Sequence, residues 1–233
     1  MAETERQFAE IKPRSMRHDV LRQLRNAILE GAIKPGDRLN ESEIARQMGI
    51  SRGPVREAIL ALEQEALVTT VHWRGSYVTE LDPHSFRELV ELRILLETHA
   101  AKQAARRCRL EALAELERAV AEMRAAHAAG DLEDVIDRDL DFHHAICRAA
   151  GNSLLLKAWE QLSGRLRLAI LLSIQLGYDA GAMVETHPPV IEAMRQGDPE
   201  LTAQLLNDRT WEAAEIIIAR LAERAALRAT ASD

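Results

Sequence analysis

Cysteine and aromatic residues are scarce in this chain. Only two of the 233 residues are cysteine, Cys108 and Cys147, and they do not show the close spacing of paired metal ligands. This excludes a disulfide scaffold and a cysteine-based zinc module, and it indicates reduced thiols. Phenylalanine, tryptophan and tyrosine together make up 3% of the chain, so we expect a core of leucine, isoleucine, valine and alanine.

Long apolar segments are also absent. The longest run, residues 168–172, is far shorter than the ~20 apolar residues that a membrane-spanning helix needs. Residues 1–14 are polar and partly acidic, unlike a signal peptide. We therefore expect a cytoplasmic protein without a membrane partner, whose first 14 residues form a flexible arm.

Two short helical patterns meet at a turn within the sequence ESEIARQMGISRGPVREAILALEQEAL. Asn40 and Glu43 are expected to form a capping box at the start of the first helix. Gly49 is expected to end that helix, because glycine readily adopts a positive φ. This arrangement predicts a helix, a tight turn and a second helix.

The second helix is expected to start with basic side chains exposed. Ser51 is the predicted cap, and Pro54 falls in the first turn, where no amide donor is needed. Arg52 and Arg56 are exposed near the same end. A helix N-terminus bearing arginines is suited to phosphates and guanine edges in a DNA major groove, so we interpret the pair as a helix-turn-helix.

Flanking elements favour this interpretation over an ordinary helical hairpin with a charged surface. An amphipathic helix is predicted over residues 18–30, before the pair. Two short strands are predicted at residues 67–71 and 76–81, around a basic tip with the sequence HWRG. A helix, a helix-turn-helix and a hairpin together indicate a winged DNA-binding domain.

The run AILEGAIKPGDRLNESEIARQMGISRGPVREAILALEQEALV, with the later RGSYV, resembles the N-terminal domain of GntR-type transcriptional regulators. This resemblance covers roughly residues 15–80 and implies binding to a double-stranded DNA operator. It places DNA contacts on the recognition helix, the preceding helix and the wing, at Ser51, Arg52, Pro54, Arg56, Arg46, His72 and Gly75. Arg74 adds a positive charge to the same wing tip.

Charge is distributed unevenly along the chain. Residues 1–80 contain 12 Lys and Arg and 12 Asp and Glu, whereas the remainder contains 18 and 25 and accounts for the net charge of −7. The modest number of basic residues predicts few phosphate contacts per subunit. We therefore expect a homodimer that reads a pseudo-palindromic operator.

From Leu81 onward, helical patterns follow one another. Helices are expected at residues 83–107, 110–129, 132–150 and 153–176, in a proline-interrupted segment ending at Gly197, and at residues 199–227. The predicted fold is mainly α, with a winged helix-turn-helix at residues 15–81 and an antiparallel all-α bundle for effector binding and dimerisation at residues 82–227. Residues 228–233 are expected to be a disordered tail.

Asp139 and His143 lie four residues apart on one predicted helix, so both side chains can face one cation. The alternative to a metal-binding pair is that Asp139 is an ordinary surface carboxylate and that His143 has its hydrogen bonds made by other groups. The segments ELRILLE and DRDLDFHHAICRAAGNSLL resemble the FCD ligand-binding domain of FadR-branch GntR regulators, over about residues 85–222. This resemblance implies that Asp139, His143 and His187 bind a divalent metal, such as Zn²⁺ or Ni²⁺, and that the domain binds an effector.

The fourth ligand position of that family falls on Arg209, and a guanidinium does not coordinate metals. Pro188 is expected to bias His187 away from helical geometry. The alternative role for Arg209 is recognition, either by holding an acidic effector through two parallel hydrogen bonds or by neutralising Asp139.

Two further arginines are candidates for effector binding. Arg93 corresponds to an arginine that faces the effector in the family. The alternative role for Arg93 is an ion pair with Glu97 on the protein surface. Arg165 is a candidate because it lies in the otherwise apolar helix predicted at residues 153–176. His144 is expected to point away from the site, because neighbouring residues lie ~100° apart around a helix.

These features predict a ligand-responsive transcription factor, most simply a repressor whose operator affinity changes when a small organic acid binds. A metal-dependent enzyme is an alternative, but no general base or nucleophile accompanies the predicted ligands. A constitutive DNA-binding protein without an effector is the other alternative. Polar residues inside an aliphatic bundle disfavour it, because burying them without a partner is costly.

Overall fold

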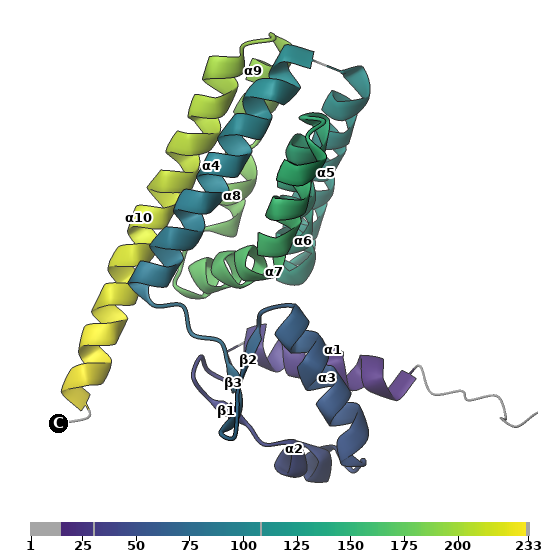
Figure 1. Ribbon diagram of the computed structural model, residues 1–233, viewed down its shortest axis with the longest axis vertical. Coiled ribbons are helices and arrows are strands. Elements are labelled where there is room, and N and C mark those ends of the chain that lie inside the picture. The colour runs from purple at the N-terminus through teal and green to yellow at the C-terminus, as the bar shows by residue number, and fades with distance from the viewer. Residues whose placement is uncertain (1–14, 30, 108, 232–233) are drawn as a thin grey trace, which may run out of the picture. The chain divides into compact units, whose positions relative to one another are not determined.

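The computed structural model describes residues 15–29, 31–107 and 109–231. The predicted N-terminal arm and Cys108 lie outside the described residues. Two compact units divide the chain between Thr79 and Glu80, close to the predicted boundary after Leu81. Figure 1 shows that the second unit is entirely helical and that the first combines helices with a small sheet.

The first unit contains the predicted helix-turn-helix. α1 (Ser15–Leu29) precedes it, and α2 (Glu41–Met48) and α3 (Arg52–Gln64) form the pair. The buried face of α3 packs on α1, and its core side chains are Val55, Ala58, Ile59 and Leu62. These residues recur at spacings of three and four, which is the pattern of a helix with one buried face.

The start and end of α2 follow from local chemistry. Asn40 Oδ1 accepts hydrogen bonds from the backbone N–H groups of Ser42 and Glu43, at 3.0 and 3.3 Å. Gly49 ends the helix at φ 66°. The reciprocal half of the predicted capping box does not form, because the Glu43 carboxylate accepts instead from Arg46.

Ser51 occupies the N-cap position of α3, but its side chain makes no capping hydrogen bond. The predicted capping role of Ser51 is therefore wrong. Pro54 lies in the first turn of α3, where an amide donor has no partner within the helix. The start of α3 thus depends on proline and on its buried face rather than on a capping side chain.

A three-stranded antiparallel sheet completes the first unit. β2 (Val68–Val71) and β3 (Gly75–Val78) form the predicted hairpin, and β1 (Arg38–Leu39) pairs with β3 to give the order β1-β3-β2. Val71 pairs with Gly75, and Arg38 pairs with Tyr77. The sequence did not predict β1, because two residues are too few to show an alternating pattern.

The second unit consists of helices that largely follow the predicted ranges. They are α4 (Pro83–Arg107), α5 (Leu110–Ala129), α6 (Leu132–Ala149), α7 (Ser153–Gln175), α8 (Ala180–Glu185), α9 (Pro188–Arg195) and α10 (Pro199–Ala231). None of the helices that the structure describes combines the length and apolar character that crossing a bilayer requires.

The end of the chain differs from the prediction. α10 continues to Ala231, so the described part of the predicted disordered tail is helical. Residues 225–231 are mostly Ala, Leu and Arg, which have high helix propensity. This composition favours a continued helix over a disordered tail.

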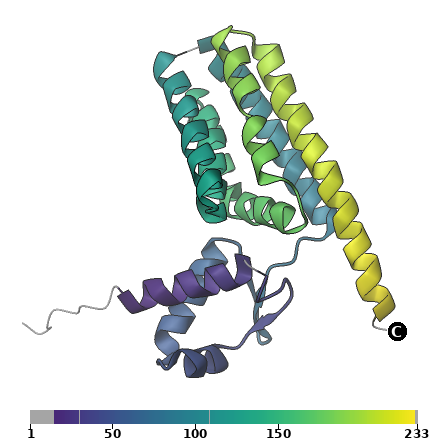
Figure 2. The same cartoon turned by 180° about the vertical axis from the view of Figure 1, so that it is seen from behind.

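The helices of the second unit surround an aliphatic core. α4 and α10 run side by side, and α5 packs against α6; both views show this arrangement (Figures 1 and 2). α7, α8 and α9 complete the bundle. Polar side chains interrupt this core at Glu97, Asp139, His143, His187 and Thr202, all of which are buried.

Candidate effector pocket and DNA-binding face

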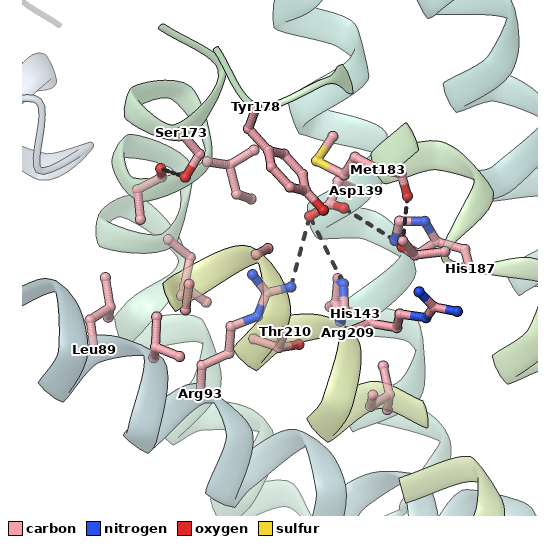
Figure 3. A pocket seen from close by; sticks show the side chains of 18 of the residues that line it. Leu89, Arg93, Asp139, His143, Ser173, Tyr178, Met183, His187, Arg209 and Thr210 are labelled. Atoms are coloured by element: carbon pink, nitrogen blue, oxygen red, sulfur yellow. Dashed lines mark hydrogen bonds and ion pairs between the residues drawn. The ribbon is translucent and has the colours of Figure 1, made fainter. Parts of the chain in front are cut away.

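A cavity of about 100 Å³ lies inside the helical unit. One buried water needs roughly 10–15 Å³ on the same measure, so the cavity can hold a small organic molecule. Much of its wall is apolar, including Phe86, Leu89, Val90, Leu166, Ala169 and Ile170. Figure 3 shows Arg93, Asp139, His143 and His187 meeting there from α4, α6 and the residue before α9.

The structure brings together the three predicted ligands Asp139, His143 and His187. His187 Nε2 lies 3.1 Å from Asp139 Oδ1, and His143 Nε2 lies 3.9 Å from Asp139 Oδ2. One potential ligand atom from each residue lies within 4.8 Å of the others. All three residues are buried, so the cluster is part of the pocket wall and not a surface charge group.

The surroundings of both imidazole rings leave Nε2 available. His187 Nδ1 lies 3.2 Å from the Val184 carbonyl oxygen. His143 Nδ1 lies 2.8 Å from Glu97 Oε2, a close charged contact that is poorly aligned as a hydrogen bond. Because both neighbouring oxygens act only as acceptors, each Nδ1 is best occupied by hydrogen. Nε2 of each ring faces Asp139, and a metal ion that binds there would take the place of any proton on these nitrogens.

Asp139 is ionised in this setting. Burial alone would raise the pKa of its carboxyl, but His187, His143 and Arg93 hold that pKa well below its ordinary value. Arg93 NH2 lies 3.9 Å from Asp139 Oδ2. That oxygen is buried and has no hydrogen-bond partner among the described residues, which is an expensive arrangement unless something else binds it.

These residues fit a divalent metal ion. One ionised carboxylate and two neutral imidazoles are ligands that Zn²⁺ and Ni²⁺ accept. Asp139 Oδ2, which accepts no hydrogen bond from the described residues, gives a cation a local reason to bind. Three protein ligands do not complete a tetrahedral set, so solvent or a bound molecule would complete it.

Glu97 contacts the cluster of Asp139, His143 and His187 through His143, on the side away from the cavity. It is 1% exposed, and its carboxylate accepts a hydrogen bond from Trp159 Nε1 at 2.8 Å and from Arg93 Nε at 3.0 Å. Burial would raise the pKa of Glu97, but Arg93 and His143 lower it to about 2. An ionised Glu97 therefore orients His143, as carboxylates beside metal-binding histidines commonly do.

Arg93 pairs with Glu97, as the surface alternative predicted, but the pair does not lie on the surface. Glu97 is buried, and Arg93, whose side chain is 12% exposed, lines the pocket. Burial by itself would lower the pKa of Arg93, yet Glu97 and Asp139 raise it, so the guanidinium stays charged. Arg93 thus takes the role of neutralising Asp139 that sequence analysis offered to Arg209.

Arg209 lines the pocket but is not buried. Its side chain is 49% exposed, and its NH1 donates to Glu212 Oε2 at 3.1 Å. The expectation that Arg209 is buried and neutralises Asp139 is therefore wrong: its position on α10 gives it an exposed carboxylate partner three residues further along the same helix. Figure 3 shows it beside the pocket, near His143 and His187 in that view.

His187 also differs from its prediction. It adopts helical angles of φ −82° and ψ −41° immediately before Pro188. The general bias against this geometry is overcome by the start of α9, where Pro188 is the first helical residue. The turn between α8 and α9 thus aims His187 into the pocket.

Two other sequence candidates lie apart from this site. Arg165 is exposed and does not line the pocket. His144 points elsewhere, as predicted, and its Nε2 lies 3.1 Å from Glu160 Oε1.

The sequence did not predict three contributors to the pocket region: Glu97, Trp159 and Tyr178. Tyr178 lines the pocket, and its hydroxyl pKa is raised by burial and by the nearby Glu212 and Asp139 carboxylates, so it remains a donor. The only sequence signal was the spacing of Arg93 and Glu97. It gave no indication that the pair is buried.

The predicted DNA-contact residues of α2 and α3 form an exposed basic face. Ser51, Arg52 and Arg56 are exposed at the start of α3. Arg52 NH2 lies 3.6 Å from Glu41 Oε2, and Arg46 forks onto Glu43. Exposed ion pairs of this kind contribute little to stability. These arginines can therefore exchange their carboxylate partners for phosphates.

The hairpin tip presents the remaining predicted contacts. His72 and Arg74 are exposed, and the turn is closed by a 2.9 Å hydrogen bond from Arg74 N to the Val71 carbonyl. Gly75 has φ 111°, and a Cβ there would lie 3.1 Å from Arg38 Nε. The backbone angle favours glycine at this position, whereas the contact with Arg38 would need only a small shift of its flexible side chain.

The comparisons with known proteins agree with both units. Residues 17–78 match the bacterial regulatory proteins of the gntR family, and residues 88–209 match the FCD domain. The chain is 30% identical over 201 residues to a helix-turn-helix transcriptional regulator in an unstable DNA locus of Streptomyces ambofaciens, covering 83% of this chain and 81% of that protein.

Two further relatives support the same assignment. The gluconate operon transcriptional repressor of Bacillus subtilis is 28% identical over 190 residues, covering 79% of this chain and 78% of that protein. The structure of E. coli McbR/YncC superposes with a TM-score of 0.63 at 26% identity, covering 90% of this chain and 98% of that chain.

Winged helix-turn-helix and pocketed helical bundle together define a transcriptional regulator, not an enzyme. The chain belongs to the GntR family of bacterial regulatory proteins and carries an FCD domain as its second unit.

Proposed function

We propose that this regulator is a cytoplasmic, homodimeric repressor that leaves its operator when a small hydroxy acid enters the helical pocket. One divalent metal ion, held by Asp139, His143 and His187, is part of that binding site. The observation that carries the proposal is the buried Oδ2 of Asp139, which accepts no hydrogen bond from the described residues and lies beside two imidazoles in the cavity wall. The acid is expected to bind at the same place.

The polar groups around the cavity support an anionic, hydroxylated effector. Arg93 and Arg209 offer guanidinium groups from two helices, and Tyr178 offers a hydroxyl donor. A carboxylate accepts two parallel hydrogen bonds from a guanidinium, and hydroxyl groups pair with Tyr178 or Thr210. The remaining wall is apolar, which limits the effector to a small molecule.

A bound metal ion would act as a Lewis acid. It would bind an effector that chelates it through a carboxylate and a neighbouring hydroxyl group. The name of the Bacillus subtilis relative refers to gluconate, which is a sugar acid of this chemical type. The search for an effector therefore begins with sugar acids and other α-hydroxy acids.

The DNA-binding half of the proposal rests on the start of α3. Arg52 and Arg56 project from a helix N-terminus, where the helix dipole also attracts phosphate. In a two-fold dimer, each α3 would read one half of a pseudo-palindromic operator in its major groove. Arg46 on α2 would contact the phosphate backbone, and the wing residues His72, Arg74 and Gly75 would contact the DNA beside α3, toward the minor groove.

Release requires that the effector bind one arrangement of the protein more tightly than another. Side chains from α4, α6 and α10 all reach the cavity. A ligand that draws these helices together favours one packing of the bundle over another, and operator affinity changes by the same coupling free energy.

The first test is elemental analysis of the full chain, purified without chelators or a histidine tag. We expect a near-stoichiometric divalent metal in the wild type and its loss in His143→Ala. His144→Ala is the matched control, because the neighbouring histidine lies outside the pocket. A metal-free wild type would overturn the metal part, and the effector search would then move to simple carboxylates that bind Arg93 and Arg209.

The second test measures operator release. A duplex selected from a random pool by the full chain serves as the operator, and sugar acids are titrated against the complex. We expect release from the wild type and a blunted response in His143→Ala. If no acid changes the affinity of the wild type, the protein is a constitutive DNA-binding protein and this proposal fails.

The same duplex tests the recognition helix. Arg52→Ala and Arg56→Ala are each expected to abolish specific binding, because each removes a base-edge or phosphate contact. Arg165→Ala, an exposed arginine in the other unit, is the control for loss of surface charge. Unchanged affinity in both α3 variants would contradict the assignment, provided that circular dichroism shows both to be folded.

A further inference from the structure

The pocket of the helical unit has two chemically different sides. Figure 3 shows Asp139 and His187 on one side, with Leu89 and Ser173 on the other. The charged and ring nitrogen groups described above are gathered near Asp139. A bound molecule that fills the pocket therefore meets polar groups at one of its ends only.

α4 shows how far the apolar side extends. Phe86, Leu89, Val90 and Arg93 all line the pocket and recur at spacings of three and four, so they form one stripe along the helix. Phe86 precedes Arg93 by two helical turns, which is ~10 Å at ~1.5 Å per residue. A carboxylate bound near Arg93 thus has apolar side chains along the next two turns of α4.

α10 lines the same region from the opposite direction. It runs antiparallel to α4 (Figures 1 and 2). Arg87 lies over the Trp211 ring, 5.7 Å from its centroid, so the start of α4 lies beside the middle of α10. Ala213 and Ala214 follow Trp211 and line the pocket, and they therefore lie at the same end as Phe86. Two alanines leave space there that larger side chains would fill.

Three helices form what we call the apolar end of the pocket. Its side chains are Phe86 and Leu89 of α4, Ala169 and Ile170 of α7, and Ala213 and Ala214 of α10. The nearby Ser173 hydroxyl donates to the Ala169 carbonyl at 2.7 Å, so its hydrogen is already used within α7. Backbone groups inside helices are hydrogen-bonded to one another. A hydroxyl group buried at the apolar end would therefore lack a partner, which is costly.

The size of the cavity limits the length of a bound molecule. Its volume of about 100 Å³ has room for roughly seven to ten groups the size of a water molecule, at roughly 10–15 Å³ each. A hydroxy acid with about six carbon atoms falls within this range. Its carboxylate and neighbouring hydroxyl group would need polar partners, and the rest of the molecule would not.

We propose that the effector is a 2-hydroxy acid with an aliphatic tail, and that the tail occupies the apolar end between α4, α7 and α10. The carboxylate and the hydroxyl group bind at the side of Arg93 and Asp139. This inference rests on the proposed function and names the class of hydroxy acid that the pocket selects. Sugar acids share the same head group, but their further hydroxyl groups make them weaker ligands.

The first measurement is isothermal titration of the full chain with lactate, 2-hydroxybutyrate, 2-hydroxyhexanoate and gluconate, all in one metal state. These acids share a head group, so the contributions of Arg93 and of any bound metal cancel in the comparison. We expect affinity to rise about fourfold per added methylene group, or roughly 60-fold from lactate to 2-hydroxyhexanoate. Gluconate has the same carbon skeleton as 2-hydroxyhexanoate and is expected to bind at least about tenfold more weakly.

The outcomes of this series separate the inference from the function beneath it. If gluconate binds as tightly as 2-hydroxyhexanoate, or if affinity does not rise with tail length, the aliphatic tail is wrong and the proposed hydroxy-acid site stands. If none of these acids binds, the proposed function fails together with the inference.

Ala213→Leu tests where the tail lies. Ala213 is half-buried, and a leucine there would occupy the apolar end. We expect the affinity for 2-hydroxyhexanoate to fall about tenfold or more, because the leucine and the tail compete for one space, while lactate binds as in wild type. Ala219→Leu, at an exposed position of α10 outside the pocket, is the matched control.

Unchanged binding of 2-hydroxyhexanoate to Ala213→Leu would overturn the placement of the tail. Circular dichroism checks that both variants are folded. The ligand series uses the wild-type chain, so it tests the proposal even where Ala213→Leu does not fold.

Discussion

At the residue scale, the chemistry of the pocket depends on which nitrogen each histidine leaves free. Glu97 and the Val184 carbonyl lie beside the two Nδ1 atoms, so both Nε2 atoms face Asp139. Glu97 is itself held by Arg93 and by the Trp159 indole N–H. The arrangement explains how Arg93, Glu97 and Asp139 are tolerated as charged groups inside an aliphatic bundle. Each one has a partner of opposite charge, and Asp139 Oδ2, which accepts no hydrogen bond from the described residues, faces the cavity.

Glu97→Gln tests this support. We expect metal affinity to fall about 10–100-fold, because the substitution removes the carboxylate that orients His143. The midpoint of unfolding should also fall, since Arg93 loses one of its carboxylate partners. Metal affinity is therefore measured by isothermal titration well below that midpoint.

Glu160→Gln is the matched control for this substitution, because Glu160 contacts His144 outside the pocket. It is expected to leave metal affinity unchanged. A Glu97→Gln protein that binds metal as tightly as wild type would show that Glu97 serves packing alone.

At the scale of single elements, the two helices of the helix-turn-helix start in different ways. α2 begins at a capping asparagine whose side chain accepts two backbone hydrogen bonds. α3 begins at Ser51 without a capping contact. The sequence suggested a cap at both positions, because serine and asparagine have similar capping preferences. Only the rotamer in the folded unit separates them.

The substitutions Asn40→Ala and Ser51→Ala test this difference between the two N-cap residues. Asn40→Ala should destabilise α2 by about 1 kcal/mol, the usual contribution of a capping side chain, whereas Ser51→Ala should have little effect on stability. Hydrogen exchange of the Ser42 and Glu43 amides in the full chain measures the change directly. Equal effects of the two substitutions would contradict the capping assignments.

At the scale of the whole molecule, two compact units share one chain, and a regulator that reads a two-fold operator needs two chains. The described surface of α4 exposes two leucines on one face, Leu92 at 43% and Leu95 at 67%. Paired exposed leucines three residues apart are suited to packing against a second copy.

We expect Leu95→Glu to shift the protein toward the monomer, because a carboxylate at the centre of an apolar contact would be desolvated without a partner. Sedimentation at several concentrations measures the shift. Operator binding should weaken in parallel, since each monomer contributes few phosphate contacts. Leu110→Glu, an exposed leucine at the start of α5, is the control, and a dimer that persists in Leu95→Glu would place the interface elsewhere.

The amino-acid sequence alone determined the order and most of the bounds of the helices, the helix-turn-helix and the hairpin. These features depend on local rules: apolar spacing, a capping asparagine, and glycine at positive φ. It also identified Asp139, His143 and His187, because a helix places residues four apart on one face and the family resemblance supplied the third ligand.

Tertiary structure decided which polar residues are buried and what they contact. The exposed Arg209, the buried pair of Arg93 and Glu97, and the indole of Trp159 all depend on helices far apart in the sequence. No local pattern reports such burial, because an arginine and a glutamate four residues apart on a helix have the same spacing on a surface and in a core. The free energy of burying charge is set only when the helices pack.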